Sequence, residues 1–294
     1  MSHSRWNLLP SPPEEYFGNN GIPRLVTRLL YNRGVTGASD IESFLTADER
    51  LAASPDLLPG IHQAVARLYQ ALLSKEKIAV YGDFDADGIT ATALLVQGLS
   101  LLDFEAIPYI PNRLTEVYGL KTEALKTLRS KGVSLVITVD CGITALSEVK
   151  EARKMGMDVI ITDHHEPTNE IPQANAVINP KLKESDYPTR ELAGVGVALK
   201  LLQALFRGLG KEEKLEEVFD LVALGTVADM VPLLGENRYL VKRGLEHLNR
   251  APRLGIQEII NQTSLQTACL SSTSISWTIA PRLNAAGRLE DAMN

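Results

Sequence analysis

Acidic and histidine residues follow short hydrophobic runs at three places in the chain, and this repetition limits the folds open to it. The three clusters are residues 83–88 (DFDADG), Asp140 and residues 163–165 (DHH). Each preceding run is rich in Val and Ile, as buried strands are. Strands that alternate with helices form a mainly parallel sheet, and ligands bind such sheets beyond the carboxyl ends of the strands. We therefore expect the three clusters to meet at one sheet edge.

The hydrophobic periodicity predicts an α/β fold. It has a mainly parallel five-stranded sheet with helices on both faces, a helical segment before it and helices after it. The expected strands are 78–81, 106–110, 135–139, 159–162 and 176–178, with helices at 90–102, 122–130 and 144–155 between them. Further helices are expected at 22–32, 40–45, 61–73, 192–209, 212–228, 237–249 and 256–261, and residues 273–294 are expected to be less regular. We predict a helical segment over 1–76, a catalytic domain over 77–235, and a helical connector with a basic segment over 236–294.

Composition excludes some classes of protein and leaves others open. The 294 residues are 45% hydrophobic and 22% charged, which is typical of a globular chain. We find no membrane-spanning stretch and no secretory signal. Cys141 and Cys269 cannot build a disulfide framework, so we expect a cytoplasmic protein. The net charge of −6 does not argue against a polyanionic substrate, because bound divalent ions would offset it.

Carboxylates gathered at one sheet edge repel one another unless a cation lies among them. The segment with Asp83, Asp85 and Asp87 resembles the start of a calcium-binding loop. That loop lies between two helices and ends in Glu at its twelfth position, whereas this segment follows a strand and has Leu94 there. We therefore favour a metal site at a strand end.

His164 and His165 strengthen the prediction of a metal site, since imidazole is a common ligand of transition metals. Asp229 ends an apolar segment, and taken alone it would be a helix-terminal residue. Mixed carboxylate and imidazole ligands suit Mn²⁺ or Mg²⁺ better than a structural zinc. Two such ions about 3.5–4 Å apart can clamp a phosphate and activate water, and Asp140 would bridge them.

A phosphate also needs cationic partners. Arg113 follows the second expected strand, and Arg282, Asn284 and Arg288 lie in a segment rich in Ala and Gly. Each arginine could equally be an ordinary surface residue. The run 194–196 (GVG) resembles part of a nucleotide loop, but no strand directly precedes it, so we interpret it as close packing at a helix start.

Four ordered motifs resemble those of the DHH phosphoesterase superfamily: 83–88 (DFDADG), 139–142 (VDCG), 162–165 (TDHH) and 225–229 (GTVAD). Within it the chain is similar to the RecJ-like single-strand-specific DNA exonucleases. That narrower resemblance depends on the helical preface and on 118–120 (YGL), 192–196 (LAGVG) and 281–288 (PRLNAAGR).

The resemblance implies a role for each site residue. One Mn²⁺ or Mg²⁺ ion would be held by Asp85, Asp140, His164 and Asp229, and a second by Asp83 and Asp140. His165 would act at the scissile phosphate. Asp140 and Asp87 would be the other catalytic residues, and Asp87 would contribute structural support. Arg113, Arg282, Asn284 and Arg288 would bind the strand. Some relatives carry a further ligand His where this chain has Ala79, so the second ion would be weaker or recruited with DNA.

The resemblance also implies an activity and partners. The expected function is metal-dependent hydrolysis of single-stranded DNA in the 5′ to 3′ direction, for repair and recombination, by a monomer that works with a helicase and a single-strand-binding protein. Such proteins continue into a further domain, so we expect a truncated and weakly active chain. Two alternatives remain open: a phosphoesterase acting on small or oligonucleotide substrates, and an inactive scaffold.

Overall fold

The computed structural model describes residues 7–17, 21–113, 115–116, 118–289 and 292–293. It divides into two compact units, Met1–Leu51 and Ala52–Asn294. The first unit contains η1 (Glu14–Phe17), α1 (Arg24–Tyr31), α2 (Ala38–Thr46) and η2 (Glu49–Leu51). Within it, the rings of Tyr16 and Tyr31 pack edge to face at 5.0 Å. The predicted helices in this region are confirmed.

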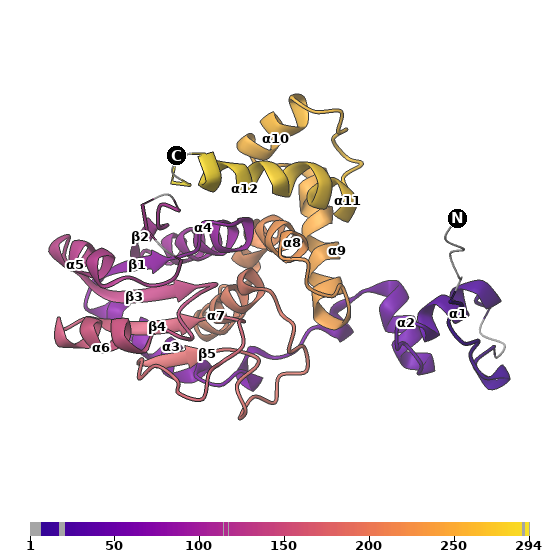
Figure 1. Ribbon diagram of the computed structural model, residues 1–294, viewed down its shortest axis with the longest axis horizontal. Coiled ribbons are helices and arrows are strands. Elements are labelled where there is room, and N and C mark those ends of the chain that lie inside the picture. Colours follow the sequence, from indigo (N-terminus) through magenta and orange to yellow (C-terminus); the bar gives the residue numbers. More distant parts are fainter. Residues whose placement is uncertain (1–6, 18–20, 114, 117, 290–291, 294) are drawn as a thin grey trace, which may run out of the picture. The chain divides into compact units, whose positions relative to one another are not determined.

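The second unit is built on a five-stranded parallel sheet with the strand order β2-β1-β3-β4-β5 (Figure 1). The strands are β1 (Lys77–Tyr81), β2 (Glu105–Tyr109), β3 (Val133–Val139), β4 (Asp158–Thr162) and β5 (Ala176–Ile178). The chain adds β2 on one side of β1 and then β3, β4 and β5 on the other side. The order of strands therefore reverses between β1 and β3. Crevices at such reversals are the usual binding places of open α/β sheets. The predicted fold class is confirmed.

Helices cover both faces of the sheet. One face packs against α3 (Ile61–Leu73), α4 (Ala86–Ser100) and α7 (Gly194–Leu209), and the other against α5 (Thr122–Ser130) and α6 (Leu146–Lys154). Alternate residues of β1 separate the two cores: Ile78 and Val80 enter the first, and Ala79 and Tyr81 the second. This period of two makes every central strand apolar on both sides.

Helices η3 (Pro55–Leu57), η4 (Glu212–Val218), α8 (Phe219–Ala228), α9 (Gly235–Arg250) and α10 (Leu254–Asn261) complete most of the unit. The predicted helix 212–228 is therefore two elements. The predicted helix 90–102 begins earlier, at Ala86, because the Asp85 side chain accepts hydrogen bonds from Asp87 N and Gly88 N and caps it.

The last segment differs from the prediction of irregular structure. It forms α11 (Ser272–Ser274), the π-helical turn η5 (Ile275–Ile279) and α12 (Ala280–Leu289), which follow one another directly. A capping box at Ser271 starts the run, and Ile275 and Ile279 are buried in a core with α8, α9 and α10. Pro281 lacks an amide hydrogen, and the wider turn ends two residues before it, at Ile279. Among the described residues, no helix is long and apolar enough to span a membrane.

Candidate metal centre

The carboxyl ends of β1, β3 and β4 bring the three sequence clusters together. Asp83, Asp140 and His164 follow these strands, and all three are buried. Asp140 has a left-handed backbone, with φ of 59°, which Asp tolerates better than most residues. Its amide donates to Thr162 O at 3.0 Å, which ties the end of β3 to β4. The sheet edge therefore fixes these side chains before any ligand binds.

Three sets of side chains have ligand atoms within 4.8 Å of one another. The sets are Asp83, Asp85 and Asp140; Asp87, His164 and Asp229; and Asp140, His164 and His165. All five predicted metal ligands belong to them, and Asp140 is shared by two sets. The sets divide the ligands differently from the predicted ion sites, because Asp85 is grouped with Asp83, and Asp87 with His164 and Asp229.

Two of these ligand atoms lack hydrogen bonds although they lie close together. His164 Nε2 is 3.0 Å from Asp140 Oδ1, both atoms are buried, and neither has a hydrogen-bond partner. Asp83 Oδ1 is also buried without one. Adjacent ligands of an octahedral ion, each about 2.1 Å from it, lie about 3 Å apart. The pair therefore has the spacing expected of two ligands to one cation.

Burial raises the pKa of the clustered carboxyl groups. The pKa of Asp83 is raised to about 6, and that of Asp140 is raised well above its usual value by burial and then by the neighbouring carboxylates. Burial likewise raises the pKa of Asp229, whose Oδ2 lies 3.7 Å from His164 Nδ1. The ionised cluster is costly without a positive charge among its members. A divalent cation would supply that charge.

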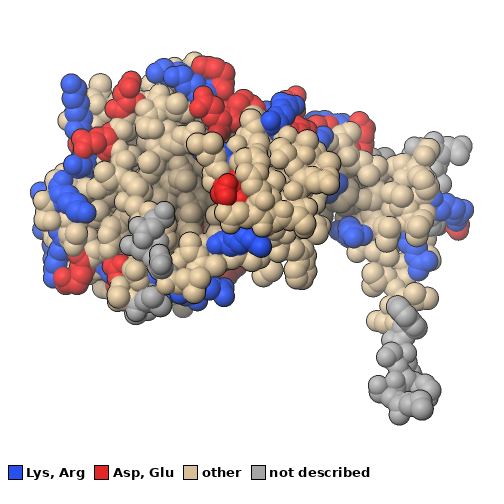
Figure 2. All heavy atoms as spheres, turned by 90° about the horizontal axis from the view of Figure 1, so that it is seen from above, with Lys and Arg blue, Asp and Glu red and all other residues tan. Residues whose placement is uncertain are grey.

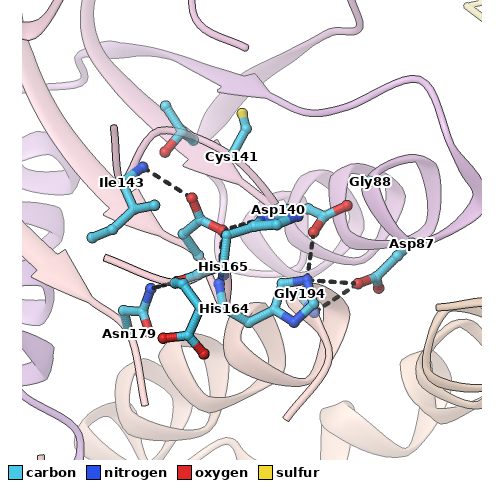
Figure 3. Close-up of polar contacts among 12 residues, drawn as sticks. Asp87, Gly88, Asp140, Cys141, Ile143, His164, His165, Asn179 and Gly194 are labelled. Atoms are coloured by element: carbon cyan, nitrogen blue, oxygen red, sulfur yellow. Dashed lines mark hydrogen bonds and ion pairs between the residues drawn. The ribbon is translucent and has the colours of Figure 1, made fainter. Parts of the chain in front are cut away.

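Asp87 makes a different set of contacts (Figure 3). Its carboxylate accepts hydrogen bonds from Gly194 N at 2.7 Å and Val195 N at 2.9 Å, and so holds the start of α7. A Cβ at Gly194 would lie 2.7 Å from Asp140 Oδ1, so only glycine fits between the two aspartates. The prediction that this glycine run packs closely at a helix start is confirmed. Asp87 has the contacts of a supporting residue, although it lies beside His164.

The sequence reasoning gave no role to Asp163. Its carboxylate accepts hydrogen bonds from the amides of Ile143, His164 and His165 and contacts His165 Nδ1 at 2.8 Å. Burial raises its pKa, but these hydrogen bonds outweigh burial and the net pKa is lowered. The same contact raises the pKa of His165 and leaves Nε2 directed away from Asp163. The sequence feature that could have revealed this role is an Asp directly before two histidines at the end of a strand.

Aromatic rings surround the approach to His165. Tyr118 packs edge to face against Phe84 and against His165, with ring centroids 6.4 and 6.1 Å apart. The Arg113 guanidinium lies 4.8 Å over the Phe84 ring. Arg113 therefore stands at the edge of the centre, as its place after β2 predicts.

The predicted basic segment lies on α12. Asn284 is the residue of this segment that contacts the loop of the metal centre. Asn284 Oδ1 accepts from Ala86 N at 2.7 Å, next to the Asp85 cap. Arg282 donates to Thr278 O, and both Arg282 and Arg288 are exposed. Ala79, by contrast, is fully buried in the core beside α5 and α6.

Comparison with known proteins identifies the family. Residues 77–226 match the DHH family, N-terminal domain. The chain is 44% identical to the single-stranded-DNA-specific exonuclease RecJ of Bacillus subtilis over 92% of its length, and 39% identical to that of Escherichia coli over 92%. It spans 34% and 48% of those two proteins.

Solved structures resemble the chain as well. A crystal structure of RecJ with Mn²⁺ from Thermus thermophilus matches 98% of the chain with a TM-score of 0.82 and 34% identity, and the match covers 41% of that protein. A crystal structure of exonuclease RecJ bound to manganese matches 83% of the chain with a TM-score of 0.74 and 39% identity, covering 60% of that protein. On the family match and the agreement of its motifs, the chain belongs to the DHH family.

Proposed function

We propose that the chain carries the metal centre of an exonuclease that hydrolyses single-stranded DNA from the 5′ end. The observation that carries the proposal is the buried pair of His164 Nε2 and Asp140 Oδ1, 3.0 Å apart and without hydrogen bonds. Relatives named as single-stranded-DNA-specific exonucleases, and relatives crystallised with Mn²⁺ or Mg²⁺, support the substrate and the metal.

The centre would hold two Mn²⁺ or Mg²⁺ ions. Asp85, Asp140, His164 and Asp229 would bind one ion, and Asp83 with Asp140 the other. When bound, such ions polarise the phosphate and lower the pKa of water. Asp87 keeps the backbone of α7 in position behind Asp140 through its bonds to Gly194 and Val195.

His165 would serve the leaving oxygen. Its Nδ1 is engaged by Asp163 at 2.8 Å, so Nε2 is the atom left to meet a phosphate oxygen. The contact with Asp163 raises the pKa of His165, which favours a proton on the ring near neutral pH. A protonated His165 can donate that proton as the bond to the leaving oxygen breaks.

The rim of the centre would bind the strand. Arg113 can bind a phosphate bidentately while its guanidinium stays over the Phe84 ring. Tyr118 offers an aromatic edge beside His165. Arg282 and Arg288, exposed on α12, would add phosphate contacts further along.

Two alternatives predict different substrates or none. A phosphoesterase of small substrates would use the same ions but would cut dinucleotides and spare long strands. An inactive scaffold would lack a working ligand set, yet every predicted ligand lies in one of the three candidate sets. The complete set therefore favours an enzyme.

The test combines Mn²⁺ titration with digestion of a long 5′-labelled single strand and of dinucleotides. We expect saturable Mn²⁺ binding and release of mononucleotides from the strand. Asp140→Asn should abolish binding and lower cleavage by about 10³-fold or more, while Asp186→Asn, at an exposed position, should match the parent. Cleavage of dinucleotides alone would support the small-substrate alternative, and absence of saturable Mn²⁺ binding would support the scaffold.

The wider context belongs to the same proposal. We assign catalysis to residues 77–235, a helical segment to 1–76, and a helical connector with a basic segment to 236–294. The protein would be a cytoplasmic monomer whose partners are a helicase and a single-strand-binding protein. The free thiols Cys141 and Cys269 agree with a reducing compartment. Sedimentation of the purified chain and its co-purification with tagged partners test these assignments.

A further inference from the structure

A small pocket is formed by the segment around the end of α8, which also carries Asp229, and by the start of the last helical run. It is lined by Val227, Met230, Val231, Leu233, Ser272, Thr273, Ser276 and Trp277, with a volume of about 310 Å³. Val227 and Met230 flank Asp229 in the sequence, so the segment that supplies a predicted ligand also forms a wall of the pocket. The volume lies at the lower end of the range of ligand pockets, about 300–1,000 Å³.

The rim of this pocket exposes two large side chains. Trp277 is 80% exposed and Met230 is 84% exposed. Met230 has a left-handed backbone, with φ of 60°, which is unusual for a residue of this size. Trp277 lies in the π-helical turn, and such turns are frequent at functional sites. Two independent backbone irregularities thus present an indole and a thioether at the same pocket.

Trp277 of the pocket and the predicted strand-binding residues belong to the same helical run. Trp277 precedes Asn284 by seven residues of the same helical run, a rise of about 10 Å along the axis. Asn284 contacts Ala86 N beside the metal centre, so the run leads from the centre to the pocket. Figure 2, which views the face carrying α10 and α12, shows charged side chains mainly at the edges of the second unit and a largely uncharged middle.

We infer that this pocket, built around Trp277 and Met230, binds a nucleobase of the single strand, one or more nucleotides away from the bond that is cut. The inference rests on the proposed function, because it takes the strand to be the substrate of the neighbouring centre. An indole stacks on any base, and a thioether packs softly against an aromatic ring. The hydroxyl groups of Ser272, Thr273 and Ser276 can hydrogen-bond base edges or sugar oxygens without selecting one base.

The test uses the intrinsic fluorescence of Trp277. The chain has two tryptophans, Trp6 and Trp277, so a Trp6→Phe background leaves one reporter. The probe is a nuclease-resistant phosphorothioate oligothymidylate, titrated with Mn²⁺ present. We expect quenching, and we expect one abasic substitution along the oligonucleotide to remove it.

Matched variants measure the contribution of stacking to binding, by anisotropy of a labelled oligonucleotide. Trp277→Ala should weaken binding roughly tenfold, within the range of about 5- to 150-fold that corresponds to the loss of one stacked base. Trp277→Phe should stay within about threefold of the parent, because a phenyl ring still stacks. Leu254→Ala, at a 91% exposed position on α10 outside the pocket, should bind as the parent does.

The outcomes separate the two proposals. If the parent chain binds and cuts the strand while Trp277→Ala and every abasic probe behave like their controls, the pocket assignment is overturned and the exonuclease stands. If the chain binds Mn²⁺ but no oligonucleotide, the strand assignment itself is overturned, and the pocket assignment with it. Quenching that depends on protein concentration without DNA would assign the pocket to a second copy of the chain and overturn the inference.

Discussion

His164 Nε2 lies 3.0 Å from Asp140 Oδ1, yet the two buried atoms share no hydrogen bond. Their separation is that of two adjacent ligands of one octahedral cation. Burial raises the pKa of Asp140, so its charge is destabilising in the metal-free protein. The chain therefore holds a buried set of ligand groups in place, and binding a cation would stabilise their ionised form.

Asp140→Asn should have opposite effects on the stability of the two forms. Asn tolerates the left-handed backbone and keeps the size of Asp, so the metal-free variant should be more stable than the parent by about 1 kcal/mol. Mn²⁺ at 100 times its Kd should stabilise the parent by about 2.7 kcal/mol and leave the variant unchanged. Urea unfolding with EDTA and with Mn²⁺ measures both. Equal stabilisation of parent and variant by Mn²⁺ would remove Asp140 from the ligand set.

Asp163→Asn should separate proton donation from metal binding. The variant loses the charge that raises the pKa of His165 and fixes its Nδ1. We expect single-turnover cleavage to fall by about 10²-fold or more, while Mn²⁺ affinity changes little. The pKa of His165, followed by NMR, should fall toward its ordinary value. His165→Ala is the comparison, and a variant that cleaves as fast as the parent would contradict the positioning role.

Substitutions at Arg282, Arg288 and Asn284 should differ in how they change the salt dependence of oligonucleotide binding. Each arginine that contacts a phosphate adds about 0.7 to the slope of log K against log [salt] for a single strand. Arg282→Ala and Arg288→Ala should therefore weaken oligonucleotide binding and each lower the slope by about that amount.

Asn284→Ala is the matched variant on the same helix. It loses the contact with Ala86 N, so it should cost about 1 kcal/mol of stability and leave the slope unchanged. An unchanged slope in both arginine variants would place the strand elsewhere.

Glu76→Gln should weaken the fold in a pH-dependent way. Glu76 accepts hydrogen bonds from Arg67 at 2.7 Å and from Ser134, and the Arg67 bond is the largest cause of its lowered pKa. A lowered folded-state pKa contributes stability that is complete above the unfolded value, near 4.5, and is lost as pH falls through the folded value.

We expect a loss of about 1 kcal/mol at pH 7, discounted for partial exposure, that shrinks below pH 4.5. Urea unfolding at pH 7 and at lower pH measures it. Glu105→Gln, in the more exposed pair with Lys77, is the control and should have little effect at either pH. A loss of the same size at both pH values would mean that the charge of Glu76 contributes nothing.

Local patterns predicted much of the fold because they report burial directly. The helix over 61–73, the helix over 122–130 and the strand over 176–178 have the predicted limits, since hydrophobic period and turn residues both mark their ends. The helix ending in Leu289 was missed because Pro281 and its Gly- and Ala-rich neighbours look irregular in isolation. It forms because buried Ile275 and Ile279 anchor it to another part of the core.

The contacts inside the metal centre were less accessible to sequence reasoning. Asp87 bonds residues 107 and 108 positions away, and Asn284 bonds Ala86 across 198 positions. No local period encodes such pairs, because they depend on how elements pack. Asp163 was visible as part of a motif, but its role depends on the contact between its carboxylate and His165 Nδ1.

The sequence alone determined that acidic and histidine side chains follow strands of a parallel sheet, and therefore that they gather at one edge, because parallel strands carry their carboxyl ends to the same side. Only the tertiary structure decided what each member does there. Tertiary contacts leave Asp140 Oδ1 and His164 Nε2 without hydrogen bonds, give Asp87 its partners at the start of α7 and give Asp163 the amide of Ile143. They also form the pocket whose lining includes residues on both sides of Asp229 in the sequence. Those differences arise from long-range contacts, which hydrophobic periodicity does not specify.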